Sequence, residues 1–286
     1  MVSLNIGLGF NLGGKQSVSN GGASDADAIL YLEALEIAGT SPTSSQVTAI
    51  DNFFIAAKAN GYYSKLKNFK FPVWGVASSN AVDMVGGTGG TFNGAMTHAN
   101  GYIQGDDSTA YLDMGTSPAA IGMSDSDGFL CALIYSATSA GIDGIMACRD
   151  SGLLGECQLS IVNLATEQGK ISNGPVITNA TISTVTSAEG IFTVNRTSPT
   201  SMRMTHLDSS GLTYGANQGT DTTGNAIASS NMYCMAGNNA GSGIYIASDY
   251  QVGFAIMGVG FSDAEVDLLT ADLKTLWETV TGLTIP

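Results

Sequence analysis

The chain has 286 residues, only 12% of them charged, and a formal net charge of −14. This acidic balance argues against nucleic acid as a partner, because phosphate binding requires a basic surface. No apolar run in the sequence approaches the roughly 18 residues of a transmembrane helix, so we expect no membrane span. Glycine occurs 37 times, which suits short strands joined by many tight turns.

The first 24 residues predict an extended arm rather than a folded unit. They are rich in Gly, Asn and Ser around a few apolar side chains, and they lack the basic start of a signal peptide. We expect this arm to become ordered only when it docks, so that it serves attachment or oligomerisation. The four cysteines of the chain have no metal-binding spacing, which favours buried thiols in a protein made in a reducing cytoplasm.

Residues 25–75 are predicted to form a helical segment. One helix fits "DADAILYLEALEIAG" and ends at Gly39, and a clearer helix is capped by Thr43 or Ser44 and stops at Gly61. A further turn in "YYSKLK" would extend the apolar face of the second helix. That face comprises Val47, Ile50, Phe54, Ala57, Tyr62 and Leu66.

Four of the ten cationic residues of the chain gather in this segment: Lys58, Lys65, Lys67 and Lys70. In one interpretation they are the solvated face of an amphipathic element. In the other they form a docking surface for an acidic partner, such as a second copy of this acidic chain. The sequence leaves both interpretations open.

Residues 76–260 differ in character from the segment before them. Short apolar or alternating runs are separated by clusters of turn residues, and "IFTVNR" with "SMRMTHLD" predicts a hairpin that bends at Ser198-Pro199. About ten such runs without intervening helices predict an antiparallel β-sandwich.

The chain closes with an amphipathic helix predicted over residues 262–281. Ser262 and Glu265 form a capping box, and Gly282 ends the helix. Its apolar stripe must pack on the sheet or on the N-terminal helix. The stripe comprises Val266, Leu269, Leu273, Leu276, Trp277 and Val280.

The region from "GIFTVNRTSPTSMRMTHLDSSGL" through "GVGFSDAE" resembles concanavalin A-like, laminin-G-like jelly rolls. In those domains a strand leads into a helix that begins (L/F)S-x-x-E, as Phe261, Ser262 and Glu265 do here. The resemblance spans residues 76–286. It implies a mainly β, concanavalin A-like sandwich for this part of the chain.

The earlier stretch "AIDNFFIAAKANGYYSKLKNFKFPVWG" is similar to a segment that precedes such jelly rolls in virion proteins of tailed phages. The residues that carry this similarity are Ala49, Ile50, Asn52, Phe53, Gly61, Tyr63, Lys65, Leu66, Lys67, Phe71, Pro72 and Gly75. The similarity implies a virion location for a protein made in the host cytoplasm.

No catalytic set is visible in the sequence. Glycoside hydrolysis needs two carboxyl groups held close together. The glutamates between residues 37 and 260 are Glu156, Glu167 and Glu189, and their spacing does not place two of them on one strand face. We therefore expect no enzyme and no cofactor. Asp125 and Asp127 in "MSDSDGF" leave Ca²⁺ open as an alternative, although the full calcium-loop spacing is missing.

A lectin-like edge would combine exposed aromatic rings with amide groups. Candidate glycan-binding residues in or beside loops are Tyr214, Asn217, Tyr233, Asn238 and Asn239. The same residue types are also ordinary in turns, where their side chains bind local backbone.

The main hypothesis is a non-enzymatic structural protein of the phage virion: a capsid-bound fibre, a decoration protein or a tail-associated protein. It would attach through its N-terminal region and project the jelly roll outward. Its partners would be other virion proteins and copies of itself, with a trimer favoured. The alternative is a lectin-like module that binds host-surface glycans.

Overall fold

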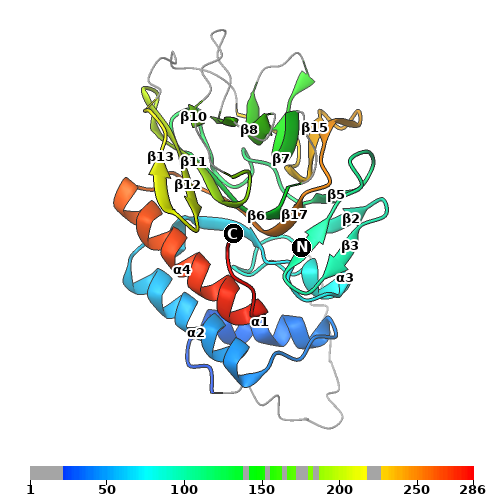
Figure 1. Cartoon of the computed structure of the whole chain (residues 1–286), viewed down its shortest axis with the longest axis vertical. Coiled ribbons are helices and arrows are strands. Elements are labelled where there is room, and N and C mark those ends of the chain that lie inside the picture. The colour runs from blue at the N-terminus through cyan, green and yellow to red at the C-terminus, as the bar shows by residue number, and fades with distance from the viewer. Residues whose placement is uncertain are drawn as a thin grey trace, which may run out of the picture.

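A computed structural model describes residues 22–137, 142–151, 155–162, 166–171, 180–182, 187–217 and 227–286. In these residues two β-sheets stack face to face, and helices cover the outer face of one of them (Figure 1). All but the last three residues of the predicted N-terminal arm lie outside the described residues.

The first sheet contains eight of the strands in the described residues. Its spatial order is β13 (Gly211–Tyr214), β12 (Ser201–Asp208), β11 (Gly190–Ser198), β6 (Gly128–Ser136), β17 (Gln251–Gly258), β4 (Tyr102–Gln104) and β3 (Thr97–Ala99), with β1 (Leu66–Lys70) paired to β17. The predicted hairpin is β11 and β12, and its bend follows Ser198 as expected.

The second sheet contains nine strands in the described residues. Its spatial order is β10 (Ala180–Ile182), β9 (Thr166–Ile171), β8 (Glu156–Val162), β7 (Ile142–Arg149), β14 (Tyr233–Cys234), β5 (Tyr111–Asp113) and β2 (Thr91–Asn93), with β15 (Ala236–Asn239) beside β7 and β16 (Ile244–Ala247) beside β15. The strand pairs of both sheets are antiparallel apart from β7 and β15. The predicted mainly β, antiparallel sandwich is therefore confirmed.

The two central strands of the first sheet, β6 and β17, are buried on both faces. Successive side chains of a strand point to opposite faces, and here both sets are apolar. Phe129, Cys131 and Leu133 of β6 belong to the core beneath the helices. The residues between them, Leu130 and Ala132, belong to the core between the two sheets. This two-sided burial explains why these strands are continuous apolar runs rather than alternating ones.

The N-terminal helices form where they were predicted. α1 (Ala26–Ile37) is capped by Asp25, whose side chain accepts the backbone N–H groups of Asp27 and Ala28. α2 (Ser44–Ala59) has a capping box between Thr43 and Gln46. A single short turn of helix, α3 (Ala77–Asn80), follows later in the chain. No helix among the described residues is long and apolar enough to cross a membrane.

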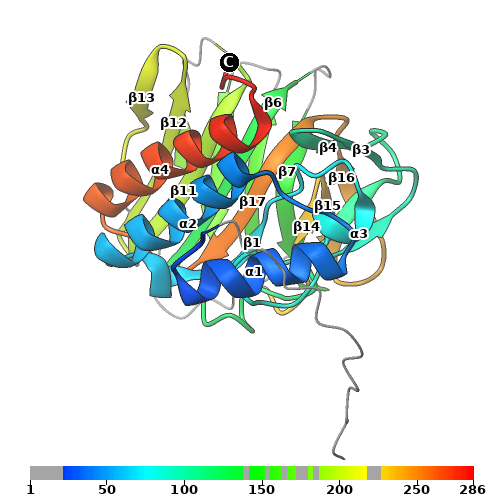
Figure 2. The ribbon, with the colours of Figure 1, turned by 90° about the horizontal axis from the view of Figure 1, so that it is seen from below.

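The C-terminal helix α4 (Asp263–Thr281) confirms its predicted bounds to within one residue. The Ser262–Glu265 capping box is present, and Gly282 ends the helix with φ 72°, a conformation that glycine adopts without strain. α4 lies beside α2, and both helices cover the outer face of the first sheet (Figure 2).

The segment after α2 differs from its prediction. Residues predicted as a further helical turn form a short 3₁₀ turn at Tyr63–Lys65 and then strand β1, which pairs antiparallel with β17. Gly61, with φ 81°, ends the helical path. The N-terminal segment therefore contributes a strand to the first sheet as well as two helices above it.

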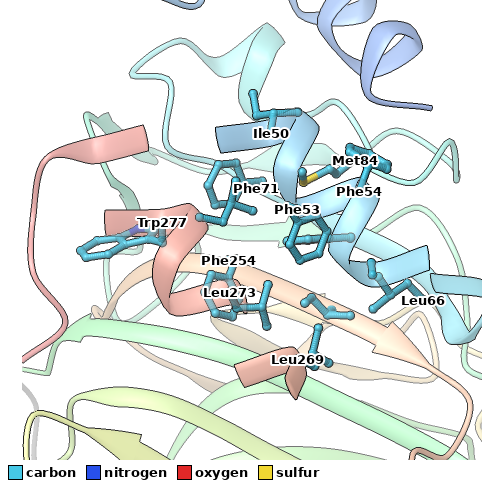
Figure 3. Packing of buried hydrophobic residues seen from close by; sticks show 14 of the residues in the cluster. Ile50, Phe53, Phe54, Leu66, Phe71, Met84, Phe254, Leu269, Leu273 and Trp277 are labelled. Carbon is cyan, nitrogen blue, oxygen red and sulfur yellow. The ribbon is translucent and has the colours of Figure 1, made fainter. Parts of the chain in front are cut away.

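An aromatic and aliphatic core fills the space between the helices and the first sheet. Phe53 of α2 lies over Phe254 of β17, and Leu273 of α4 packs beside them (Figure 3). The indole N–H of Trp277 donates to the Gly101 carbonyl oxygen at 3.0 Å. This core holds the start of α4 against the sheet, and the candidate site lies at that start.

Candidate functional site

A cleft of about 570 Å³ lies where the first sheet meets the N-terminal end of α4. It is lined by Asp127, Thr197, Ser201, Arg203, Asn217, Gly260, Phe261, Ser262 and Asp263. Most of these side chains carry hydroxyl, amide, carboxylate or guanidinium groups, so the cleft offers hydrogen-bond donors and acceptors together.

An arginine–carboxylate pair forms one wall of the cleft. Arg203 of β12 donates from Nη1 to Oδ2 of Asp263 at 2.5 Å, and both side chains remain partly exposed. The Arg203 guanidinium carbon also lies 5.5 Å from the centre of the Tyr214 ring. The Tyr214 hydroxyl in turn donates to Asp267, one turn further along α4. These contacts fix an exposed aromatic ring beside a charged pair.

Side-chain hydrogen bonds hold the backbone of residues 260 and 261, which line the cleft. The buried side chain of Asn195 accepts the Phe261 N–H at 2.9 Å and donates to the Phe261 carbonyl oxygen. The Gly260 N–H donates to Asp127. A Cβ at Gly260 would lie 2.5 Å from the Arg196 carbonyl oxygen, so this close approach requires glycine. The "GVGFSDAE" junction is thereby fixed in place.

One of the five predicted glycan-binding residues, Asn217, lines this cleft, and a second, Tyr214, lies beside it next to Arg203. Tyr214 is exposed, and Asn217 accepts the Ser201 hydroxyl at 3.3 Å. Arg203 and Asp263 were not predicted from the sequence, because they are 60 positions apart and meet only in the fold. The capping box locates the start of α4, but no local signal indicates which strand side chain faces it.

The other three predicted residues lie on the second sheet, far from the cleft. In Figure 1 β13 and the orange end of α4 are at the left, and β15 is at the right. The ring of Tyr233 stacks on Tyr111 at 4.2 Å. Burial raises the pKa of Tyr233 to about 12, and the neighbouring Tyr111 hydroxyl adds to this effect. The five residues therefore do not form one site.

Asn238 and Asn239 serve the chain itself. Asn238 is buried, donates to the Asn231 carbonyl oxygen at 2.9 Å and accepts the Gly241 N–H at 2.8 Å. Asn239 accepts Nε of Arg149 at 3.0 Å. The Asn238 amide thus holds the turn between β15 and β16, the Asn239 amide ties β15 to β7, and the burial of Asn238 leaves it little surface for a ligand.

Three of the four lysines of the early segment form ion pairs with acidic residues of the same chain. The ion pairs are Lys58 with Asp25 and Asp27, Lys65 with Glu265, and Lys70 with Asp83. Lys67 donates to the Ser64 carbonyl oxygen and is exposed. Lys70 is completely buried. A docking surface that includes Lys70 is therefore excluded, because its charge is used to join β1 to residue 83.

Two of these ion pairs make the fold sensitive to acid. Burial alone would raise the pKa of Glu265, but hydrogen bonds from Lys65 and from Ser262 hold it below its usual 4.5. Burial would likewise raise the pKa of Asp25. Hydrogen bonds from Lys58 and from two backbone N–H groups outweigh this effect and hold the pKa below its usual 3.8. A carboxyl group with a lowered pKa stabilises the folded state above its unfolded pKa, and this stabilisation is lost as the pH falls.

We therefore expect the urea midpoint to fall between pH 5 and pH 2.5, measured by circular dichroism at a series of pH values. Glu265→Gln keeps the capping geometry but cannot titrate, so this variant should lose less stability over the same interval. Parallel pH profiles for the variant and the wild type would show that the Glu265 carboxyl group does not cause the acid sensitivity.

The candidate calcium ligands do not gather into a site. Among the residues that the structure describes, no group of three or more His, Cys, Asp or Glu side chains is arranged to hold a metal ion. The Asp127 carboxylate accepts the Gly260 N–H and lines the cleft.

No protein-family model matches this chain, and no curated protein matches it. Solved structures do match. The Trypanosoma rangeli sialidase has a TM-score of 0.50 at 9% identity, over 80% of this chain and 39% of the sialidase. The same sialidase in its covalent intermediate with 2,3-difluorosialic acid gives 0.50 at 10% identity, over the same shares.

A third structure is the carbohydrate-binding module CBM40 of the Ruminococcus gnavus IT-sialidase, bound to α2,3-sialyllactose. It gives a TM-score of 0.38 at 10% identity, over 51% of this chain and 82% of the module. The chain spans about two fifths of the length of the sialidase that it matches. At these identities the likeness establishes architecture alone: this chain has the jelly-roll β-sandwich fold found in the sialidase structures.

Proposed function

We propose that this chain is a lectin-like module that binds a glycan in the cleft where β11 and β12 meet the start of α4, beside Tyr214 of β13. The observation that carries the proposal is the Arg203–Asp263 pair beside the exposed Tyr214 ring, in an open polar cleft. Support from the fold is limited to architecture, since jelly rolls serve many functions.

The cleft has the chemistry that a sugar ring requires. Neighbouring hydroxyl groups of a sugar both donate and accept, and an arginine–carboxylate pair offers donors and acceptors side by side. The apolar C–H face of a sugar packs on an aromatic ring, and Tyr214 presents such a ring at small cost in side-chain entropy. Asn217 and Ser201 add an amide and a hydroxyl to the lining of the cleft.

Charge favours neutral glycans over acidic ones. The chain carries a net charge of −14, and two carboxylates, Asp127 and Asp263, line the cleft itself. Asp263 also neutralises Arg203, the one cationic side chain among the described residues that line the cleft. A negative surface potential lowers the local concentration of anionic ligands. Sialylated glycans are therefore expected to bind less well than their neutral counterparts.

A glycan array tests this proposal, with lactose and sialyllactose included as a matched pair. We expect reproducible binding that Arg203→Ala and Tyr214→Ala each weaken by about tenfold or more, as is typical of central arginine and tyrosine contacts. Titration calorimetry with the best glycan then measures the change in Kd.

The matched control is Tyr233→Ala, which removes one of the two stacked tyrosine rings of the second sheet and leaves the cleft intact. Its affinity should equal that of the wild type. Loss of binding in Tyr233→Ala with retention in Tyr214→Ala would move the site to the second sheet. Absence of binding to any glycan would reject the proposed function.

The virion role implied by the sequence resemblance remains a separate prediction. It includes attachment through residues 1–24, a homotrimer and other virion proteins as partners. The sialidase structures reported above are not virion proteins and add no support to it. Co-purification of the protein with phage particles, and its mass by light scattering, would test the two parts of this prediction.

A further inference from the structure

Two of the four cysteines lie directly opposite each other on neighbouring strands. β7 and β8 pair antiparallel, and Cys148 is the register partner of Cys157. Both side chains are completely buried in the core between the two sheets. Side chains opposite each other on antiparallel strands point to the same face, with Cβ atoms about 4.5–5.5 Å apart. The two thiols therefore face each other.

The backbone geometry already suits a covalent link. A disulfide needs Cα atoms roughly 4.4–6.8 Å apart, and opposed residues of an antiparallel pair have Cα atoms about 4.5 or 5.5 Å apart. The thiols also interact in the reduced protein: after burial, the largest influence that raises the pKa of Cys148 is its hydrogen bond with Cys157. Closure requires side-chain rotation and a small approach of the two strands, because a disulfide holds its Cβ atoms about 3.5–4.5 Å apart.

The other two cysteines are opposed by different residue types. Cys131 of β6 pairs with Thr193 and Ile256, and Cys234 of β14 lies between Leu112 and Met146. All four cysteines are buried thiols in this structure. All four cysteines are thus buried, but only Cys148 and Cys157 lie opposite another cysteine.

We propose that Cys148 and Cys157 are a redox site, which closes into a cross-strand disulfide when the protein meets a small uncharged oxidant such as hydrogen peroxide. The thiolate of one cysteine attacks a peroxide oxygen, the O–O bond breaks, and a sulfenic acid forms as water leaves. The second cysteine then attacks the sulfenic sulfur, the S–S bond forms, and a second water leaves. One peroxide thus accepts the two electrons and two protons of both thiols.

The link would stabilise the sandwich. It closes a loop of about ten residues between β7 and β8 and restricts the unfolded chain, which corresponds to a rise in Tm of about 5 °C for a chain of this size. The reaction should be slow, because burial keeps the pKa of Cys148 well above its usual value and the thiolate is the reactive form. A protein made in a reducing compartment would thus fold first and become cross-linked afterwards.

The test uses the full chain, treated overnight with hydrogen peroxide or with a reductant, then unfolded and alkylated with iodoacetamide. After peroxide we expect two of the four cysteines to escape alkylation. Peptide mapping should then find Cys148 joined to Cys157, with a mass two hydrogens below the sum of the reduced peptides. Four alkylated cysteines after peroxide, or a link that involves Cys131 or Cys234, would overturn the proposal.

Alanine variants separate the pair from its surroundings. Cys234→Ala is the matched control and should still form the link and gain Tm on oxidation. Cys157→Ala should neither form the disulfide nor gain Tm on oxidation. It should instead accumulate a sulfenic acid at Cys148 that dimedone traps. Equal gains in Tm for the two variants would count against the proposal. The wild-type peptide map decides the matter even where a variant fails to fold.

Discussion

A chain that begins at residue 76 is expected to lose the native fold, although the sequence separates residues 25–75 from the sandwich. β1 pairs with β17 over four registered residue pairs. The ring of Phe69 lies 6.2 Å from that of Phe254 and 5.7 Å from that of Phe53. Removal of the N-terminal segment would therefore expose the outer apolar face of β6 and β17 to water.

The size of the effect follows from the buried rings alone. Truncation of one buried phenylalanine to alanine costs about 3–5 kcal/mol, and the whole stability of a domain is only about 5–15 kcal/mol. The shortened chain loses Phe53, Phe54, Phe69 and Phe71, all of them buried. The loss exceeds the stability available, so we expect no cooperative urea transition and strong binding of a hydrophobic dye.

A point variant keeps this test quantitative if the shortened chain aggregates. Phe69→Ala should lower the free energy of unfolding by about 3–5 kcal/mol. The control Leu30→Ala removes a large apolar side chain that is 63% exposed, and should change it by less than about 0.5 kcal/mol. A chain of residues 76–286 that unfolds cooperatively at the wild-type midpoint would show that the sandwich is independent.

Local signals in the sequence predict the helices and the hairpin well. The capping box of Ser262 and Glu265 and the stop at Gly282 locate α4, since each satisfies helix-end groups within a few residues. The β11–β12 hairpin is also local, because its two strands flank a Pro-containing bend. Contacts of this kind need no knowledge of the rest of the fold.

The environment of the lysines in residues 58–70 could not be predicted from neighbouring residues in the sequence. Lysine near aromatic residues suggests a solvated face, yet Lys70 is buried because β1 lies between α2, residue 83 and β17. Its partner, Asp83, is 13 positions away, beyond a turn. The same limit applies to the cleft, where Arg203 meets Asp263 across 60 positions. Such pairs form because of the way the helices pack on the sheet. Hydrophobic periodicity alone does not predict which side chains meet across that packing.

Disruption of the buried ion pair between Lys70 and Asp83 is expected to cause a second large loss of stability. Nζ of Lys70 lies 3.0 Å from Oδ2 of Asp83, with both side chains essentially inaccessible to water, and also donates to the Thr88 carbonyl oxygen. Asp83 accepts backbone N–H groups from Phe69, Val85 and Gly87. Burial lowers the pKa of Lys70, and Asp83 opposes this shift. The pair thus ties β1 to the loop that follows α3.

Lys70→Met is expected to lower the free energy of unfolding by about 3–5 kcal/mol, because it leaves the Asp83 carboxylate buried without its countercharge. Lys67→Met is the matched control: that lysine is exposed and three residues away, so its change should stay below about 0.5 kcal/mol. Urea denaturation followed by tryptophan fluorescence measures both.

The double variant Lys70→Met, Asp83→Asn separates charge from packing. Asparagine keeps one carbonyl oxygen for the backbone N–H groups but carries no charge, so the double variant should be more stable than Lys70→Met alone. This order follows only if the uncompensated charge causes most of the loss. If the double variant is instead less stable than Lys70→Met, the hydrogen bonds of Asp83 to its own loop outweigh its charge, and Lys70 acts mainly by filling space.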